Sequence, residues 1–269
     1  MKNKRNLLKI FISLLLVLSI SISAMADKAK TDKNDDNIED DNIDSDWKEP
    51  DHVKIGDSKP IVTVDPVTHI GKAQFIHWDK YATDNEIVKS SSGVCYSTFA
   101  TWNSNIPVTY TINPTNPQKL SSTFIKSAIS TAAGTWDTAT GKSLFNPYKT
   151  DSAAKFGKRD GKNAIVFGKY YYPLAIAVTG IWFDSITGQI YETDMLFNTN
   201  FRWGDATKDP RKMDLQNIAT HELGHVVGLD DIYDSSCASV TMYGYSGYGD
   251  VAKRTLESPD ITGLLSMYP

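Results

Sequence analysis

The chain has 269 residues and a formal net charge of −4 at pH 7, which suits one substantial domain with additional segments. Hydrophobic residues make up 41% of it and charged residues 22%, as in ordinary globular proteins. Basic residues do not cluster as they do in nucleic-acid-binding surfaces, so we expect no nucleic-acid partner.

The N-terminus has the anatomy of a signal peptide. A basic start precedes an almost wholly apolar stretch at residues 7–20, and Ala24-Met25-Ala26 offers a cleavage site. The apolar stretch is short for a membrane span, which needs about 20 residues, so residues 1–26 are predicted to be cleaved. No second long apolar run follows. We therefore expect a secreted, extracellular protein that is free of the membrane and monomeric.

The segments that follow differ in composition. Residues 27–50 are rich in Asp, Asn, Glu and Lys and poor in apolar residues, so they are expected to form an acidic disordered linker. Residues 51–94 hold short β-like pieces, such as residues 61–64, broken by prolines and a glycine. Either a removed pro-segment or an ordered N-terminal extension fits them. From residue 95 the pattern becomes regular, and it predicts one compact domain over residues 95–269.

This domain has the pattern of an α+β protein, with strands preceding the main helix. Asp214 is the expected N-cap of the main helix and Gly228 its C-terminal stop. Alternating or continuous apolar residues predict strands at 108–112, 164–167, 175–183 and 189–197. Helical spacing of apolar residues predicts helices at 120–136, 215–227 and 258–267.

The main predicted helix carries the sequence His221-Glu222-Leu223-Gly224-His225. Histidines four residues apart lie on one face, one turn apart, so they can bind one zinc ion. Zinc lowers the pKa of its bound water to about 7, and Glu222 can take the proton as general base. Water is then the nucleophile, and no serine or cysteine nucleophile is needed.

The residues after this helix predict the third zinc ligand. Gly228 permits a left-handed turn, and the reversed chain can bring Asp231 to the same metal. Two histidines and one carboxylate with an open position form a catalytic zinc arrangement. Asp230 is the nearest alternative ligand. A helix whose histidines merely satisfy hydrogen bonds would leave the matching Glu, Gly and Asp unexplained.

Residues 221–231 resemble the extended zinc motif of the metzincin metallopeptidases, in their matrixin branch. Most metzincins have His in place of Asp231, and Asp at this position resembles the small bacterial secreted proteases of the snapalysin type. Residues 239–243 look like the Met-turn, in which Met242 would lie beneath the zinc. Residues 256–268 look like the C-terminal helix of matrixins.

The resemblance implies a metzincin-like zinc protease fold with a twisted mixed five-stranded sheet, an active-site helix, a Met-turn and a C-terminal helix. Residues 175–181 would be its edge strand, which binds a peptide or protein substrate as an added strand. The implied function is a secreted zinc-dependent endopeptidase with one catalytic Zn²⁺ ion. Tyr245 is a candidate for holding the oxyanion, with a pocket wall or plain packing as alternatives.

The sequence lacks the histidines that form the second, structural zinc site of matrixins. No histidine lies between His77 and His221, so the second, structural zinc site of matrixins is not expected. Binding of Ca²⁺ near Asp184, Asp194 or Asn198 stays open, with solvated acidic side chains as the alternative.

The chain's two cysteines, Cys95 and Cys237, allow two interpretations. An even count in an exported chain favours a disulfide between them. The matrixin activation signature Pro-Arg-Cys-Gly is absent, but Gly93-Val94-Cys95 resembles it weakly. Cys95 as a zinc ligand that keeps an enzyme latent is therefore the alternative.

Two other functions compete with the endopeptidase. One is a non-catalytic adhesion or binding protein that keeps zinc for its shape, and the intact Glu222 argues against it. The other is a zinc hydrolase that acts on cell-wall amide bonds. Proteolysis that is lost on chelation would favour the endopeptidase over both.

Overall fold

The structure is a computed structural model that describes residues 42–44, 47, 53–56, 58–82 and 93–269. The expected signal peptide and most of the expected linker lie outside these residues. Among the described residues, no helix has the length and apolar character needed to cross a membrane. The elements in chain order are β1 (Ile61–Val64), β2 (Ile70–Asp79), η1 (Lys80–Ala82), β3 (Tyr110–Ile112), α2 (Ser122–Thr140), β4 (Lys149–Thr150), β5 (Asn163–Gly168), β6 (Ala175–Asp184), β7 (Ile190–Asn198), β8 (Trp203–Gly204), β9 (Met213–Asp214), α3 (Leu215–Val226), η2 (Ser235–Cys237), β10 (Tyr245–Ser246), η3 (Ala252–Arg254) and α4 (Ser258–Met267).

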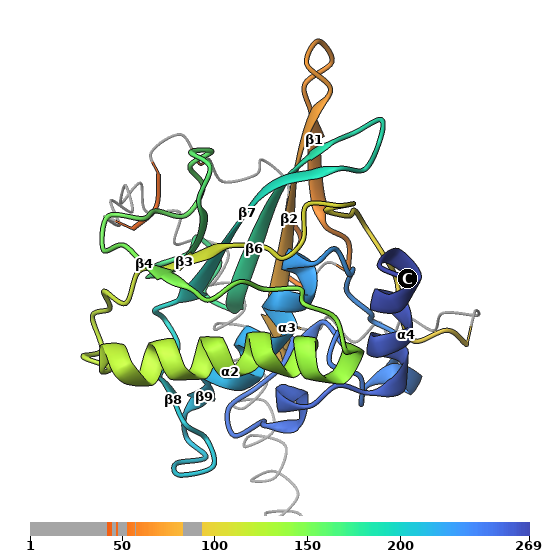
Figure 1. Ribbon diagram of the computed structural model, residues 1–269. Coiled ribbons are helices and arrows are strands. Elements are labelled where there is room, and N and C mark those ends of the chain that lie inside the picture. Colours follow the sequence, from red (N-terminus) through yellow and green to blue (C-terminus); the bar gives the residue numbers. More distant parts are fainter. Residues whose placement is uncertain (1–41, 45–46, 48–52, 57, 83–92) are drawn as a thin grey trace, which may run out of the picture. The chain divides into compact units, whose positions relative to one another are not determined.

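One mixed sheet of eight strands runs through the molecule (Figure 1), in the order β1-β2-β6-β7-β5-β3-β4, with β10 beside β2. Strand β6 is antiparallel to β2 and β7, whereas β5 is parallel to β7 and β3. The five neighbouring strands β6, β7, β5, β3 and β4 form the mixed sheet expected from the sequence. The α+β fold is therefore confirmed. The sheet is wider than five strands because β2, which precedes the expected domain, pairs with β6, and β1 and β10 pair with β2.

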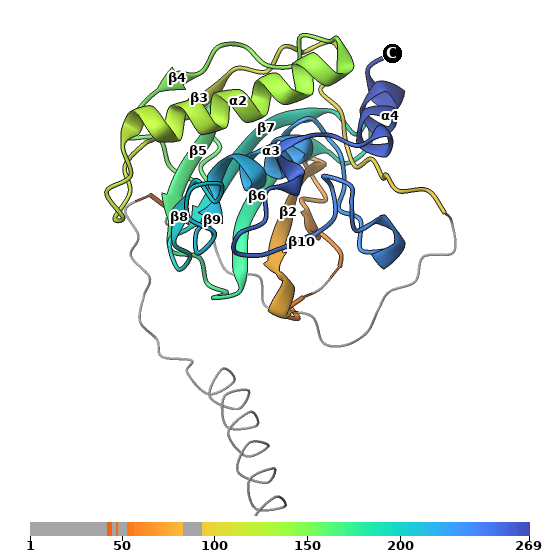
Figure 2. The same ribbon diagram turned by 90° about the horizontal axis from the view of Figure 1, so that it is seen from below.

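The sheet separates two hydrophobic clusters, because successive side chains of a strand point to opposite faces. On β6, Ala177 and Ile181 belong to the cluster that contains the helices, and Val178 and Trp182 belong to the other. Helices α2 and α3 lie together over the first face (Figure 2). Trp136 of α2 is buried and donates from Nε1 to the Thr220 carbonyl of α3 at 2.8 Å.

The helix ends follow the capping residues of the sequence. The Asp214 side chain accepts a hydrogen bond from the Asn217 amide, and α3 starts at the next residue after this N-cap, as predicted. Gly228 has a φ of 100°, which confirms the left-handed stop after α3. Helix α4 has the predicted bounds, and α2 begins two residues later than predicted because Ser121 caps it.

Two residues of the expected linker are packed against the sheet. Ile43 forms a bridge with Phe156, and Trp47 is only 2% exposed. The Trp47 side chain lies so close to Gly157 and Gly180 that a Cβ at either position would be 2.6 Å from it. The part of residues 27–50 that the structure describes is therefore docked, and the linker prediction is untested for the rest.

Candidate active site

Helix α3 places His221 and His225 on one face, where both side chains are fully buried. Their Nε2 atoms lie 3.1 Å apart. The chain reverses after α3 and brings Oδ1 of Asp231 to 3.2 Å from Nε2 of His221 and 3.5 Å from Nε2 of His225. Three side chains that the motif singled out therefore converge on one point.

The protonation of both rings follows from their second nitrogens. Nδ1 of His221 lies 2.7 Å from the Thr241 carbonyl oxygen, and Nδ1 of His225 lies 2.9 Å from that of Leu229. A carbonyl oxygen can only accept, so each Nδ1 carries the hydrogen and donates it. Each Nε2 is then left with a bare lone pair, which is the form that binds a metal ion.

These donor atoms fit a zinc ion. Oδ1 of Asp231 is buried and has no hydrogen-bond partner among the described residues. Bonds of about 2.0–2.2 Å to a tetrahedral zinc would put ligand atoms about 3.3–3.6 Å apart, close to the separations observed. Three bare acceptors at this spacing repel one another unless they share a cation.

Asp230, the alternative ligand, is turned to other partners. Its Oδ1 accepts from the amide of Asp231 at 2.8 Å, and its Oδ2 accepts from the Ser97 hydroxyl at 3.4 Å. The chain reversal thus presents Asp231, not Asp230, to the two histidines, as the spacing predicts.

Glu222 lies beside this triplet and is fully buried. Thr179 of β6 donates to Glu222 Oε2 at 2.5 Å, whereas Oε1 has no hydrogen-bond partner among the described residues. Burial raises the pKa of Glu222 to about 7. A carboxylate of this kind can both take and return a proton near neutral pH.

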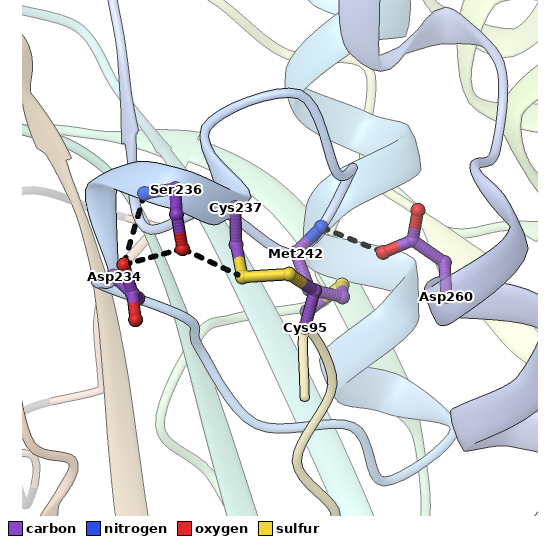
Figure 3. Close-up of a disulfide and its surroundings, with 6 residues drawn as sticks. All are labelled: Cys95, Asp234, Ser236, Cys237, Met242 and Asp260. Carbon is purple, nitrogen blue, oxygen red and sulfur yellow. Dashed lines mark hydrogen bonds between the residues drawn. A yellow bond between two sulfur atoms is a disulfide. The ribbon is translucent and has the colours of Figure 1, made fainter. Parts of the chain in front are cut away.

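The turn that holds Met242 lies under α3, where Met242 packs against Gly224. The Met242 amide donates to Oδ1 of Asp260 on α4 at 3.1 Å. Figure 3 shows this contact beside the disulfide between Cys95 and Cys237. The disulfide confirms the favoured interpretation of the cysteines. The alternative, Cys95 as a zinc ligand, is wrong here because its sulfur is bonded to Cys237.

The sequence from residue 101 to residue 269 matches the family described as Matrixin. The chain belongs to the matrixin family. It is accordingly a zinc metallopeptidase that acts on peptide substrates. No curated protein matches the chain. The finer resemblance to the snapalysin type stays a prediction.

Tyr233 of this matrixin contacts the proposed metal site, and the role of Tyr245 stays a prediction. The Tyr245 hydroxyl donates to the Gly56 carbonyl at 3.1 Å. The Tyr233 hydroxyl instead donates to Oδ2 of Asp231 at 3.2 Å, which leaves Oδ1 facing the histidines. Sequence reasoning missed Tyr233, although it follows Asp231 by only two residues.

The three residues proposed for Ca²⁺ have partners within the protein. Asp184 accepts from the amides of residues 186 and 187, and the buried Asp194 accepts from those of residues 157 and 164. The side-chain oxygen of Asn198 accepts from the amides of residues 170 and 200. Calcium binding at this matrixin's strands stays a prediction.

The position expected for the substrate is already filled. Strand β6 has β7 on one edge and β2 on the other, with nine residue pairs running from Ile70 opposite Asp184 to Trp78 opposite Ala175. The expectation that residues 175–181 form an edge strand is therefore wrong for this state of the chain. A substrate can add to β6 only where β2 has left it.

Strand β2 also carries His77, which sequence reasoning did not assign to the site. His77 is fully buried, and its ring centroid lies 3.9 Å from that of His221. Its Nδ1 lies 3.8 Å from Oε1 of Glu222. Burial lowers the pKa of His77 well below its ordinary value, so the ring is neutral. The sequence alone could not assign His77 to the site. It lies about 140 residues from the motif, and only long-range strand pairing brings the two together.

Proposed function

We propose that this matrixin is a secreted endopeptidase in which His221, His225 and Asp231 hold one zinc ion and Glu222 is the general base. The observation that carries the proposal is the convergence of three bare acceptor atoms beside a carboxylate with one unpartnered oxygen. The family supports the reaction class. The geometry supports the role of each residue.

A zinc ion at these atoms would polarise the scissile carbonyl and acidify the attacking water. Glu222 Oε1 accepts a proton from that water as its oxygen bonds to the carbonyl carbon. Glu222 then returns the proton to the amine nitrogen as the carbon–nitrogen bond breaks. The Thr179 hydroxyl holds Oε2 throughout, so Oε1 remains the proton-carrying oxygen.

Other contacts keep the three ligands in position. The carbonyls of Thr241 and Leu229 fix the ring orientations and tautomers of the two histidines. Tyr233 holds the second oxygen of Asp231. Partners of this kind orient ligands and raise their basicity, and their loss typically weakens metal binding about 10–100-fold.

The same proposal includes three expectations from the sequence. The protein is exported, it is monomeric, and it has no nucleic-acid partner. A disulfide between Cys95 and Cys237 supports export, since such bonds persist in oxidising compartments. The substrate would bind as an extended strand along β6 after β2 has been displaced.

A casein assay on the full chain tests the proposal. Wild type and Glu222→Gln are compared before and after brief trypsin treatment, because β2 fills the edge of β6. Trypsin is quenched with a serine-protease inhibitor. We expect treated wild type to exceed Glu222→Gln by at least about a hundred-fold, the usual scale of general-base catalysis. The zinc chelator 1,10-phenanthroline should abolish the activity, and added zinc should restore it.

Glu192→Gln on β7 is the matched control. This buried side chain accepts from the amides of Asp160 and Gly161 and makes no contact with the metal site. It should keep wild-type activity per folded molecule. Elemental analysis should find zinc retained in Glu222→Gln. Hydrolysis by Glu222→Gln at the wild-type rate would overturn the role of Glu222, and chelator-resistant hydrolysis would overturn the zinc.

A further inference from the structure

The inward side of β2 lies directly over the two histidines of α3. Phe75 stacks on the ring of His225, with centroids 4.5 Å apart and an interplanar angle of 25°. Two residues further along the same face, the His77 ring meets the edge of His221 at 3.9 Å. Phe75 closes off the outer side of one ligand, and His77 brings a third imidazole to the metal site.

The local backbone supports this placement of His77. The register between β2 and β6 shifts between His77 and Trp78, where residue 176 of β6 is passed over. Bulges of this type re-aim side chains and occur near active sites. On the other edge of β2, β10 pairs with Trp78 and Asp79. The strand is therefore held from both sides at the point where it passes the site.

His77 has no hydrogen-bond partner for either ring nitrogen among the described residues, although it is fully buried. A buried polar atom without a partner destabilises the folded state. The nearest carboxylate oxygen, Oε1 of Glu222, is 3.8 Å away from Nδ1, which is beyond hydrogen-bond range. Nothing in the described protein satisfies this ring.

A metal ion at the neighbouring site would satisfy it. His77, His221 and Glu222 form one group of potential ligand atoms that lie within 4.8 Å of one another, and His221, His225 and Asp231 form another. His221 belongs to both groups, so the imidazole of His77 lies beside one of the three proposed zinc ligands.

We propose that His77 is a fourth protein ligand of the catalytic zinc and that β2 is a resident strand in the substrate position, which makes this state of the chain latent. The inference rests on the proposed function. With four protein ligands the zinc site is closed, as in structural sites, whereas catalysis needs an open position. Departure of β2 removes the ligand and frees the edge of β6 in one step.

The first test uses the unmodified full chain with Co²⁺ in place of zinc. Proton NMR of such a protein shows strongly shifted, exchangeable ring N–H signals from each coordinated histidine. His77 bound through one nitrogen keeps its hydrogen on the other. We expect three such signals, from His77, His221 and His225. Two signals would overturn the inference without touching the proposed zinc site.

The second test measures zinc affinity by chelator competition. His77→Leu and His77→Ala should each bind zinc at least about ten-fold more weakly than wild type. Loss of a residue that only supports a ligand already weakens metal binding by about this factor. The visible absorption of the Co²⁺ form should change in both. His69→Asn is the matched control, because His69 sits in the turn before β2 with a φ of 58° that Asn tolerates. It should bind zinc as wild type does.

Asp231→Ala separates the two proposals. If it loses zinc affinity while both His77 variants keep wild-type affinity and spectra, His77 is not a ligand and the proposed function stands. If wild type itself binds neither metal, the proposed zinc site fails and the inference fails with it. Circular dichroism shows whether each variant is folded, and the NMR count needs no variant at all.

Discussion

The carbonyl oxygen of Thr241 accepts a hydrogen bond from Nδ1 of His221 at 2.7 Å, so the turn that carries Met242 also sets the tautomer of a proposed zinc ligand. That turn is fixed in its own right by α4. The Asp260 carboxylate accepts from the amides of Thr241 and Met242, at 2.9 and 3.1 Å. The C-terminal helix thereby reaches the metal site through one buried carboxylate and one turn.

This chain of contacts predicts that Asp260→Asn weakens zinc binding without touching a ligand. An amide can accept at only one of its atoms, so one of the Thr241 and Met242 amides loses its partner and the turn shifts. We expect zinc affinity to fall about ten-fold, at the lower end of the range for supporting residues. Chelator competition on the folded variant measures this.

Asp137→Asn is the control for this prediction. Its carboxylate similarly ties down a loop, by accepting from the amides of Leu144 and Phe145 at the end of α2. Asparagine keeps Oδ1, the oxygen that accepts both amides, so the substitution should leave the loop and the zinc affinity unchanged. Equal zinc affinities for Asp260→Asn and wild type would show that the turn does not depend on α4.

The left-handed stop after α3 predicts a severe effect of Gly228→Ala. Gly228 has a φ of 100°, and a Cβ there would overlap the carbonyl oxygen of Ala100. The left-handed backbone alone costs a residue with a Cβ about 1–2 kcal/mol. With the clash added, we expect a loss of at least about 3 kcal/mol in the free energy of unfolding. Urea denaturation with zinc removed measures it.

Gly141→Ala separates the two causes. Gly141 is also left-handed, with a φ of 66°, but no atom lies within 4 Å of the position a Cβ would take. It should therefore lose only the backbone cost of about 1–2 kcal/mol. Equal losses for the two variants would show that the contact with Ala100 does not matter.

What the sequence predicts well in this matrixin is local. The histidines of α3 sit one helical turn apart, and their glycine stop and N-cap are within a few residues, so spacing alone places them. Asp231 follows from the same short stretch. The bounds of β6 and α4 also follow from continuous local patterns.

What the sequence does not predict depends on distant pairing. Thr179 reaches Glu222, and His77 reaches His221, only because β6 and β2 pass over α3. Residues 70–79 show no clean alternation, because both faces of β2 are covered, and the pairing joins segments about a hundred residues apart. The resemblance to matrixins also implied a free edge on β6. It therefore could not reveal that an N-terminal strand of this chain fills that edge.

The loss of folding stability at acid pH should depend on Asp205. Its carboxylate accepts hydrogen bonds from Thr207 and Arg254. The Thr207 hydroxyl, followed by Lys208 and Arg254, lowers the pKa of Asp205 to about 2, against about 3.9 in an unfolded chain. A lowered pKa in the folded state stabilises the fold above the unfolded pKa. The contribution is therefore complete above about pH 5 and disappears as the pH falls towards 2.

Asp205→Asn should consequently cost about 1–2 kcal/mol at pH 6, after allowance for solvent screening of a partly exposed group, and almost nothing near pH 2. Urea unfolding of both proteins across that range gives the two curves, which should converge at low pH. Asp209→Asn is the control: Arg211 lowers the pKa of Asp209 to about 2 as well, but on the exposed surface. Its effect should fade in high salt because exposed charges are screened, whereas that of Asp205 should persist. A difference between wild type and Asp205→Asn that stays constant with pH would contradict the assignment.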